Sequence, residues 1–281
     1  MLQFGVRGHD IPGETLEERV KNIAEAGFCC TQLALSKAIK EFPTGAEAMT
    51  SGMAMYMRRL FEQYRVNVAV LGCYKNLATP DEEELKQNLK LYMHHIRFAS
   101  YLGCGVVGTE TGAVNKEYRY TPENHTKEAL QIFTENLKKV VAYAETMGVC
   151  VGIEPVYKHI MCDLERTRAV LHAVNSPNLR VILDPINLLN AENESRHNEI
   201  VDGAFELFGE EIDVIHMKDY VVRDGEIISR PVTLGEGQFD IPHLMKLIKQ
   251  KKPFINISLE DSIPENVQKS RAYVMKCYEE A

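Results

Sequence analysis

Four residues that can bind a metal each end a short apolar run rich in β-branched side chains. In chain order they are Glu154, Asp184, His216 and Glu260. A carboxylate at the end of a buried strand is costly unless something pairs with it. Three converging carboxylates also repel one another, and a divalent cation would relieve both costs. Oxygen ligands with a single imidazole favour Mn²⁺, although Mg²⁺, Co²⁺ or Zn²⁺ would also fit. The pattern predicts a site for one divalent metal ion.

These runs belong to a longer series in which β-rich segments alternate with helical patterns. The eight expected strands cover residues 2–6, 29–35, 66–72, 105–110, 149–154, 179–184, 212–216 and 254–260. Eight strand–helix units without a linker-like break favour one α/β domain over residues 1–281, folded as a single (β/α)8 TIM barrel. A doubly wound open sheet is the alternative, but "GVRGHDIPG" after the first strand lacks the G-x-G-x-x-G spacing usual there.

Capping residues and glycines indicate where the helices begin and end. Starts are predicted at Thr15, at Thr79 with Pro80 as the first helical residue, at Thr121-Pro122 and at Asp240. Glycines close several helices before the next strand, namely Gly27, Gly103 and Gly148.

Residue parity predicts which side chains enter the barrel, because successive side chains of a strand point to opposite faces. Val151 and Ile153 share one face of their strand, whereas the small Gly152 and the terminal Glu154 share the other. The small face suits the barrel interior. The same argument turns the other three candidate ligands inward, at the C-terminal ends of their strands. In barrel enzymes the active site lies at this C-terminal end of the strands, which we call the mouth of the barrel.

Five further polar residues are predicted to contact a substrate at the mouth: Lys218, Asn187, Glu110, Gln32 and His9. Lys218 shares the inward parity of His216, and Glu110 ends a strand on its inward face. Each residue has a structural alternative. The lysine could pair with a carboxylate, Glu110 could form a salt bridge, the two amides could be satisfied in the core, and His9 could make a local hydrogen bond.

Several stretches resemble the sugar phosphate isomerase/epimerase superfamily, the xylose isomerase-like TIM barrels to which endonuclease IV is related. They are "GIEPV" (152–156), "ILDPINLL" (182–189), "VIHMKD" (214–219), "LGEGQFD" (234–240) and "SLED" (258–261). The resemblance runs along essentially the whole chain. It implies that the four candidate residues bind one metal ion, and that Glu154 and Glu260 also serve as the acid/base pair.

The resemblance implies a metal-dependent isomerase or epimerase of carbohydrate metabolism, acting on a small sugar, sugar phosphate or polyol ketone. The two glutamates would transfer a proton through a metal-stabilised enediolate. One departure is Asn187, where many relatives have a histidine, because an asparagine cannot shuttle a proton. An inosose dehydratase-like lyase on the same metal site therefore stays open. A non-catalytic sugar-binding barrel and endonuclease IV-like DNA repair are less favoured.

Composition limits the partners and the compartment. The chain has 32 Lys and Arg against 40 Asp and Glu, a net charge of −8, and no long basic block, which argues against a nucleic-acid partner. Seven cysteines without a Cys-x-x-Cys motif indicate reduced thiols. With no signal peptide and no membrane-spanning run, these features predict a cytoplasmic protein without a membrane partner. Whether it forms a homo-oligomer stays open.

Overall fold

Eight parallel strands form a closed barrel in the computed structural model of the protein, which describes residues 2–281. The barrel strands are β1 (Gln3–Arg7), β2 (Cys30–Leu33), β3 (Asn67–Gly72), β4 (Val106–Glu110), β5 (Cys150–Glu154), β6 (Leu179–Leu183), β7 (Ile212–Met217) and β10 (Asn256–Leu259). All eight lie within two residues of their expected bounds. The ring closes where β1 pairs with β10. The predicted (β/α)8 barrel is therefore confirmed, and the doubly wound open sheet is wrong.

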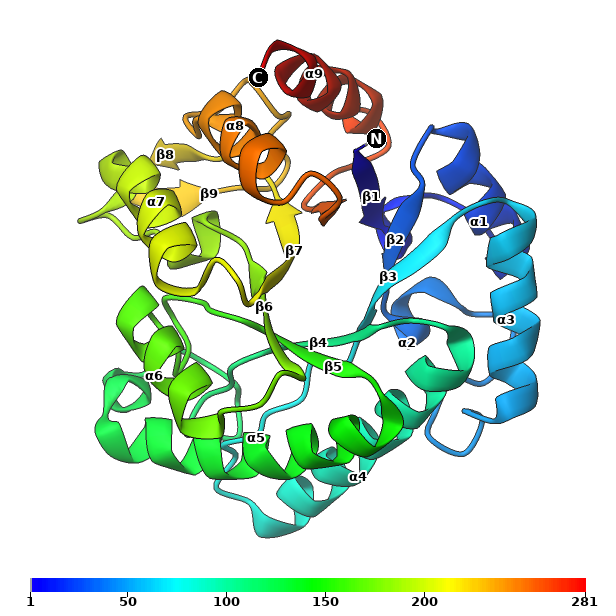
Figure 1. Ribbon diagram of the computed structural model, residues 1–281, viewed down its shortest axis with the longest axis vertical. Coiled ribbons are helices and arrows are strands. Elements are labelled where there is room, and N and C mark those ends of the chain that lie inside the picture. The colour runs from blue at the N-terminus through cyan, green and yellow to red at the C-terminus, as the bar shows by residue number, and fades with distance from the viewer. Residues whose placement is uncertain (1) are drawn as a thin grey trace.

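The helices form an outer ring around the strands (Figure 1). They are α1 (Leu16–Glu25), α2 (Leu35–Ala38), α3 (Ser51–Gln63), α4 (Glu82–Leu102), α5 (Lys127–Met147), α6 (Leu164–Val174), α7 (His197–Phe208), α8 (Ile241–Lys251) and α9 (Val267–Glu280). Short 3-10 turns lie at Gly8–Asp10, Pro122–His125, Ile186–Leu188 and Glu194–Arg196. Within residues 2–281, none of the helices has the length and apolar character needed to cross a membrane.

Two predicted helix starts are wrong, and competing caps explain both. Helix α4 begins at Glu82 because the carboxylate of Asp81, not the hydroxyl of Thr79, accepts hydrogen bonds from the first free backbone N–H groups. Pro122 opens only a short 3-10 turn, and Thr126 caps α5 instead. The starts at Thr15 and Asp240 are confirmed by their side-chain caps. Glycines at 103 and 148 end α4 and α5 in the left-handed conformation, as expected.

The hydrophobic core has two layers, and strand parity divides them as predicted. Val151 and Ile153 belong to the large cluster between the barrel and the helices. Ile182 and Val214 instead belong to a small cluster inside the barrel. Since Asp184 and His216 follow these two residues at the next inward position, the same parity carries them to the open end of the barrel.

Glycine is required at position 152 because the barrel interior is already filled there. A Cβ atom on Gly152 would lie 2.8 Å from Val106 Cγ1 and 2.9 Å from Ile182 Cγ1. We therefore expect Gly152→Ala to lower the free energy of unfolding by about 1–3 kcal/mol, the usual cost of overpacking, as measured by urea denaturation. Gly105→Ala is the matched control, because its Cβ would meet no atom within 4 Å. Equal losses in the two variants would contradict the packing argument.

A short antiparallel hairpin, which the sequence analysis missed, follows β7 at the barrel mouth. It consists of β8 (Val221–Arg223) and β9 (Glu226–Ile228). Asp224 and Gly225 join the strands with φ values of +51° and +79°, as a tight Asp-Gly turn requires. Just beyond β9, Ser229 Oγ donates a 2.6 Å hydrogen bond to Asp261 Oδ2. The hairpin is thus tethered to the residue that follows Glu260.

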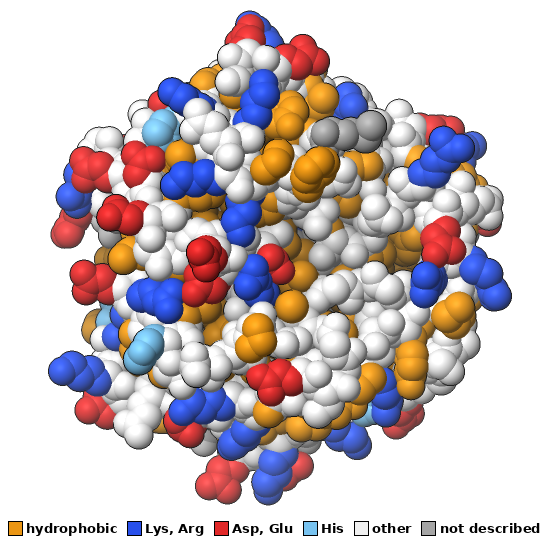
Figure 2. All heavy atoms as spheres, viewed as in Figure 1, with side chains coloured by type: hydrophobic (Ala, Val, Ile, Leu, Met, Phe, Trp, Pro, Cys, Tyr) orange, Lys and Arg blue, Asp and Glu red, His pale blue; other side chains and the backbone are white. Residues whose placement is uncertain are grey.

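The surface seen in Figure 2 mixes charges of both signs. Lys and Arg side chains alternate with Asp and Glu side chains across this face, and its described residues form no broad patch of one sign. This face therefore lacks the extended basic footprint that binds a nucleic-acid backbone.

Candidate metal centre

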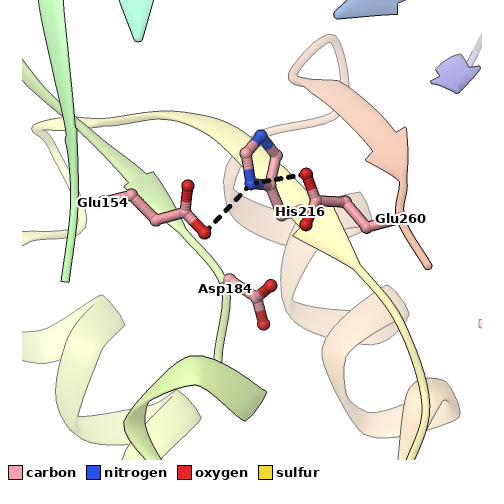
Figure 3. Close-up of side chains that lie close together, drawn as sticks. All are labelled: Glu154, Asp184, His216 and Glu260. Atoms are coloured by element: carbon pink, nitrogen blue, oxygen red, sulfur yellow. Dashed lines mark ion pairs between the residues drawn. The ribbon is translucent and has the colours of Figure 1, made fainter. Parts of the chain in front are cut away.

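Glu154, Asp184, His216 and Glu260 converge at the barrel mouth, each from a different strand or strand end (Figure 3). One ligand atom from each residue lies within 4.8 Å of the others. His216 Nδ1 lies 3.3 Å from Glu154 Oε1 and 3.3 Å from Glu260 Oε1, so the two glutamates approach the imidazole from opposite sides. All four residues are at most 8% exposed. The structure thus brings together the residues that the sequence predicted to meet.

The donor set fits a divalent cation. His216 is fully buried, yet neither of its ring nitrogens makes a hydrogen bond with any residue of the described chain. Nδ1 meets only the two glutamates at 3.3 Å, and Nε2 has no hydrogen-bond partner among residues 2–281. Buried polar atoms without a hydrogen bond are rare unless they serve a further ligand. Three buried carboxylates around this ring supply the negative charge that a cation would neutralise. Three oxygen donors with one nitrogen donor suit Mn²⁺ or Mg²⁺ better than a structural zinc site. The assignment of the four residues as ligands stays a prediction.

Among the protein groups alone, the charges of the centre are strongly interdependent. Burial by itself would lower the pKa of His216, but Glu260 and Glu154 outweigh burial and raise that pKa to about 9. Burial favours a higher pKa for Glu154, and the adjacent His216 reverses this and lowers it. At Glu260 burial dominates, and the pKa is raised. Glu154 and the imidazole therefore stabilise each other's charged forms, whereas at Glu260 burial outweighs the attraction of the imidazole.

Asn187 and Lys218 form a hydrogen-bonded chain that fixes the centre from one side. Asn187 Nδ2 donates to Glu154 Oε1 over 2.6 Å, and Lys218 Nζ donates to Asn187 Oδ1 over 2.6 Å. Lys218 Nζ also lies 2.9 Å from Asp184 Oδ2. Burial would lower the pKa of Lys218, but Asp184, Glu260 and Asp261 together outweigh burial and raise it, so the ammonium stays charged. Both residues reach the predicted region, and their contact with a substrate stays a prediction.

Glu110 ends β4 directly beside Glu154 in the parallel register. Its Oε2 accepts a hydrogen bond of 3.3 Å from the Tyr118 hydroxyl and lies 3.7 Å from His159 Nδ1. Burial, reinforced by the charges of Glu154 and Glu260, raises the pKa of Glu110 to about 7. Glu110 therefore lies at the edge of the acidic centre, where its carboxylate contacts Tyr118 and lies near His159.

Gln32 and His9 occupy the opposite part of the mouth. Gln32 Nε2 donates to the Tyr74 hydroxyl over 2.7 Å, and its buried Oε1 has no hydrogen-bond partner among the described residues. His9 lies in the turn after β1, with its Nε2 4.0 Å from Asp10 Oδ1. Burial lowers the pKa of His9 to about 4. Neither residue contacts the four candidate ligands directly, so their substrate roles also stay predictions.

Arg7 is the main residue that the sequence analysis missed. Its Nε donates to Asp10 Oδ2 over 2.8 Å, its Nη2 donates to Asp261 Oδ1 over 3.1 Å, and its Nη1 lies 3.7 Å from Glu260 Oε2. The expected first strand stopped at Val6, one residue short of the observed end. Extending the expected strand by one residue would have placed Arg7 on the inward face with Gly5. The alternation of side chains could therefore have identified Arg7 as a residue of the barrel mouth.

A cavity of about 400 Å³ opens beside Asn187 and Lys218. Its other walls include Tyr157 and Asn190, from the loops after β5 and β6, and Glu226 of the hairpin. This volume lies in the range of small-molecule sites. The cavity gives a small substrate a route to the side of the centre that Asn187 and Lys218 border.

The chain belongs to the xylose isomerase-like TIM barrel family, whose family model matches residues 20–277. This confirms the resemblance inferred from the sequence motifs. No curated protein matches the chain.

Solved structures of low sequence identity share the fold. The apo 3-keto-D-glucoside 4-epimerase from E. coli is 13% identical with a TM-score of 0.75, covering 99% of this chain and 100% of that chain. A D-tagatose 3-epimerase-like protein is 19% identical with a TM-score of 0.75, and the match covers 99% of this chain and 97% of that chain. A xylose isomerase-like TIM barrel protein from Mycobacterium smegmatis, in complex with magnesium, is 15% identical with a TM-score of 0.71, covering 98% and 94%. At these identities the likeness establishes the fold alone.

Proposed function

We propose that the protein is a divalent-metal-dependent isomerase or epimerase that transfers a proton on a small sugar-like substrate. The observation that carries this proposal is the placement of Glu154 and Glu260, each 3.3 Å from His216 Nδ1 and on opposite sides of it. Two carboxylates that flank one point can serve the two faces of a single carbon atom. The sugar epimerases among the structures of similar fold support a sugar as the substrate class.

Glu154, Asp184, His216 and Glu260 would bind the cation, and this donor set favours Mn²⁺ over Mg²⁺, Co²⁺ or Zn²⁺. When bound, the cation polarises adjacent carbonyl and hydroxyl oxygens of a sugar and so acidifies the neighbouring C–H bond. One glutamate removes that proton and becomes a neutral acid. The other glutamate, which begins protonated, delivers its proton to the opposite face of the same carbon. Alternatively, the proton is returned to the adjacent carbon while the hydroxyl proton of the first carbon moves to the former carbonyl oxygen. The first outcome inverts the configuration and the second isomerises the sugar, in both cases without a change in composition.

Asn187 acts on this chemistry through Glu154, whose carboxylate it orients. We expect Asn187→Leu to lower kcat/KM by about 10- to 100-fold, because loss of a hydrogen bond to a ligating group has effects of that size. Steady-state kinetics on the substrate identified by the screen below would measure this loss. Asn67→Leu, at an exposed asparagine where β3 begins, is the control and should retain parental activity. Parental activity in Asn187→Leu would show that Glu154 needs no such support.

The function is tested by incubating the Mn²⁺-loaded protein with a panel of ketoses, sugar phosphates and sugar acids in deuterated water. We expect deuterium in a recovered sugar of otherwise unchanged composition, because the proton returned to carbon comes from a group that exchanges with solvent. A product that has lost one molecule of water would instead identify the lyase alternative on the same site. No exchange with any member of the panel, with or without added metal, would contradict the proposal.

A further inference from the structure

A second cavity, of about 430 Å³, opens at the mouth on the side of β2 and β3. In the ring of strands these two lie opposite β6 and β7, which carry the first cavity. Its apolar floor includes Met49, Cys73 and Leu91, and its rim carries the hydroxyls of Ser36 and Thr44. The first and second cavities therefore lie on opposite sides of the ring of strands.

The second cavity has an unbalanced positive charge. Lys37 and Lys75 line it, and no Asp or Glu does. Both lysines are exposed, and neither has an ion-pair partner within 4.0 Å among residues 2–281. An ammonium group pairs strongly with a phosphate or carboxylate oxygen, and nearby hydroxyls can donate further hydrogen bonds to it. The cavity thus offers an oxyanion two free cations and two hydroxyl donors.

Two cations close to the candidate metal centre, Arg7 and Lys218, are already neutralised by the protein. Arg7 contacts Asp10, Asp261 and Glu260, and Lys218 lies 2.9 Å from Asp184 Oδ2. An anionic group placed at the centre would also face three buried carboxylates, and like charges in close contact are strongly disfavoured. Lys158, which is exposed and has no ion pair among residues 2–281, lines the first cavity, but Glu226 lines that cavity as well. The second cavity is therefore the one of the two that has unpaired cations and no acidic residue, and electrostatics favours it for an anionic group.

Tyr74 connects this cavity to the barrel interior. Its side chain lines the cavity, and its hydroxyl accepts the hydrogen bond from Gln32 on the inward face of β2. The same hydroxyl lies 3.9 Å from the position that a Cβ on Gly108 would take inside the barrel. Tyr74 thus borders both the barrel interior and the lysine-lined cavity, and is the residue that lies between the two.

We propose that the lysine-lined cavity binds an oxyanion substituent, a phosphate ester or a carboxylate, at the far end of the substrate. This inference rests on the proposed function, since it assumes that the reacting carbon lies at the metal centre. It narrows the substrate class to an anionic sugar derivative, whose charged end fixes which carbon meets Glu154 and Glu260.

Binding of inorganic phosphate tests the cavity independently of activity. Phosphate is titrated into the full-length protein with and without Mn²⁺, followed by ³¹P line broadening and calorimetry. We expect the same Kd in both forms, because no candidate metal ligand lines the cavity. Lys37→Met and Lys75→Met should each weaken binding by about tenfold or more, as expected for loss of a charge-assisted hydrogen bond, and the double variant should weaken it further.

Lys127→Met is the matched control, at an exposed lysine that lines neither mouth cavity. It should leave the phosphate Kd unchanged. An unchanged Kd in the double variant, an equal loss in Lys127→Met, or binding that requires Mn²⁺ would each overturn the proposal. Competition with acetate distinguishes the two kinds of oxyanion substituent. If acetate displaces phosphate, the substrate's charged group is assigned as a carboxylate, and if it does not, the group is assigned as a phosphate ester.

Kinetics distinguish failure of this inference from failure of the proposed function. In the double variant, the KM of an anionic sugar should rise at least about tenfold while kcat stays unchanged, because the lysines bind the substrate without touching the reacting carbon. For neutral sugars, the double variant and the parental protein should have the same KM and kcat. The parental protein should turn over neutral sugars less efficiently than anionic ones. If neutral and anionic sugars exchange protons equally well, only the anion site fails. If no sugar exchanges, the proposed function fails while phosphate binding remains measurable.

Discussion

Replacing Glu260 by glutamine is expected to lower the rate of deuterium incorporation into the substrate by at least about 10³-fold. An amide cannot take up or deliver the proton that the carboxylate transfers, and general acid–base groups contribute rate factors of about 10²–10⁴. Glutamine also removes one negative charge from the predicted metal ligands. Mass spectrometry of the sugar recovered from deuterated water measures the loss, and Glu154→Gln should show one of similar size.

Glu265→Gln is the control for this experiment, because Glu265 is exposed in the same loop and contacts none of the four residues of the centre. It should exchange protons at the parental rate. The Mn²⁺ content of each variant is measured in parallel. Loss of exchange with retained metal assigns Glu260 to proton transfer, whereas loss of both assigns it to metal ligation. A Glu260→Gln protein that keeps more than about a tenth of the parental rate would contradict its role as a proton carrier.

Arg7→Met is expected to lower the free energy of unfolding by about 3 kcal/mol or more. The substitution preserves apolar volume but leaves the carboxylate of Asp10, whose side chain is 2% exposed, without its 2.8 Å partner. Removing one member of a buried ion pair typically costs about 3–5 kcal/mol, because the remaining charge stays desolvated. Urea denaturation measures the change.

Arg58→Met provides the comparison for Arg7. Arg58 Nε lies 2.9 Å from Glu62 Oε1, but both side chains are about half exposed, so the pair is screened by water. Its removal should change the free energy of unfolding by less than about 0.5 kcal/mol. Similar small losses in both variants would show that Arg7 does not anchor the carboxylates at the mouth.

The barrel could be predicted from the sequence because its signals are local. Each strand is a short apolar run, and alternation within the run assigns its faces, so Glu154 could be placed inward from Gly152 alone. The hairpin after β7 escaped notice because its strands have only three residues each, although Asp224-Gly225 is a strong turn signal. The cap at Asp81 was missed because Thr79 and Pro80 offered an equally plausible start nearby.

The convergence of the centre could be predicted because all four residues end neighbouring strands of one barrel. The contacts that do not follow from the order of the strands could not be predicted. Arg7 and Asp261 are 254 residues apart, and their hydrogen bond depends on the closure of β1 against β10. Asn187 was expected to form a hydrogen bond with a substrate hydroxyl, yet its amide bridges Glu154 and Lys218. Sequence parity gives the face of a side chain, but the partner depends on rotamers that only the packed structure defines.

The most direct test of the central claim is equilibrium binding of Mn²⁺ to the purified protein, measured by the electron paramagnetic resonance of the free ion. We expect one Mn²⁺ per parental chain. In His216→Gln, which removes the single nitrogen donor and keeps the three carboxylates, affinity should fall by at least about 100-fold. Absence of bound divalent metal in the parent, or equal affinity in His216→Gln, would contradict the account.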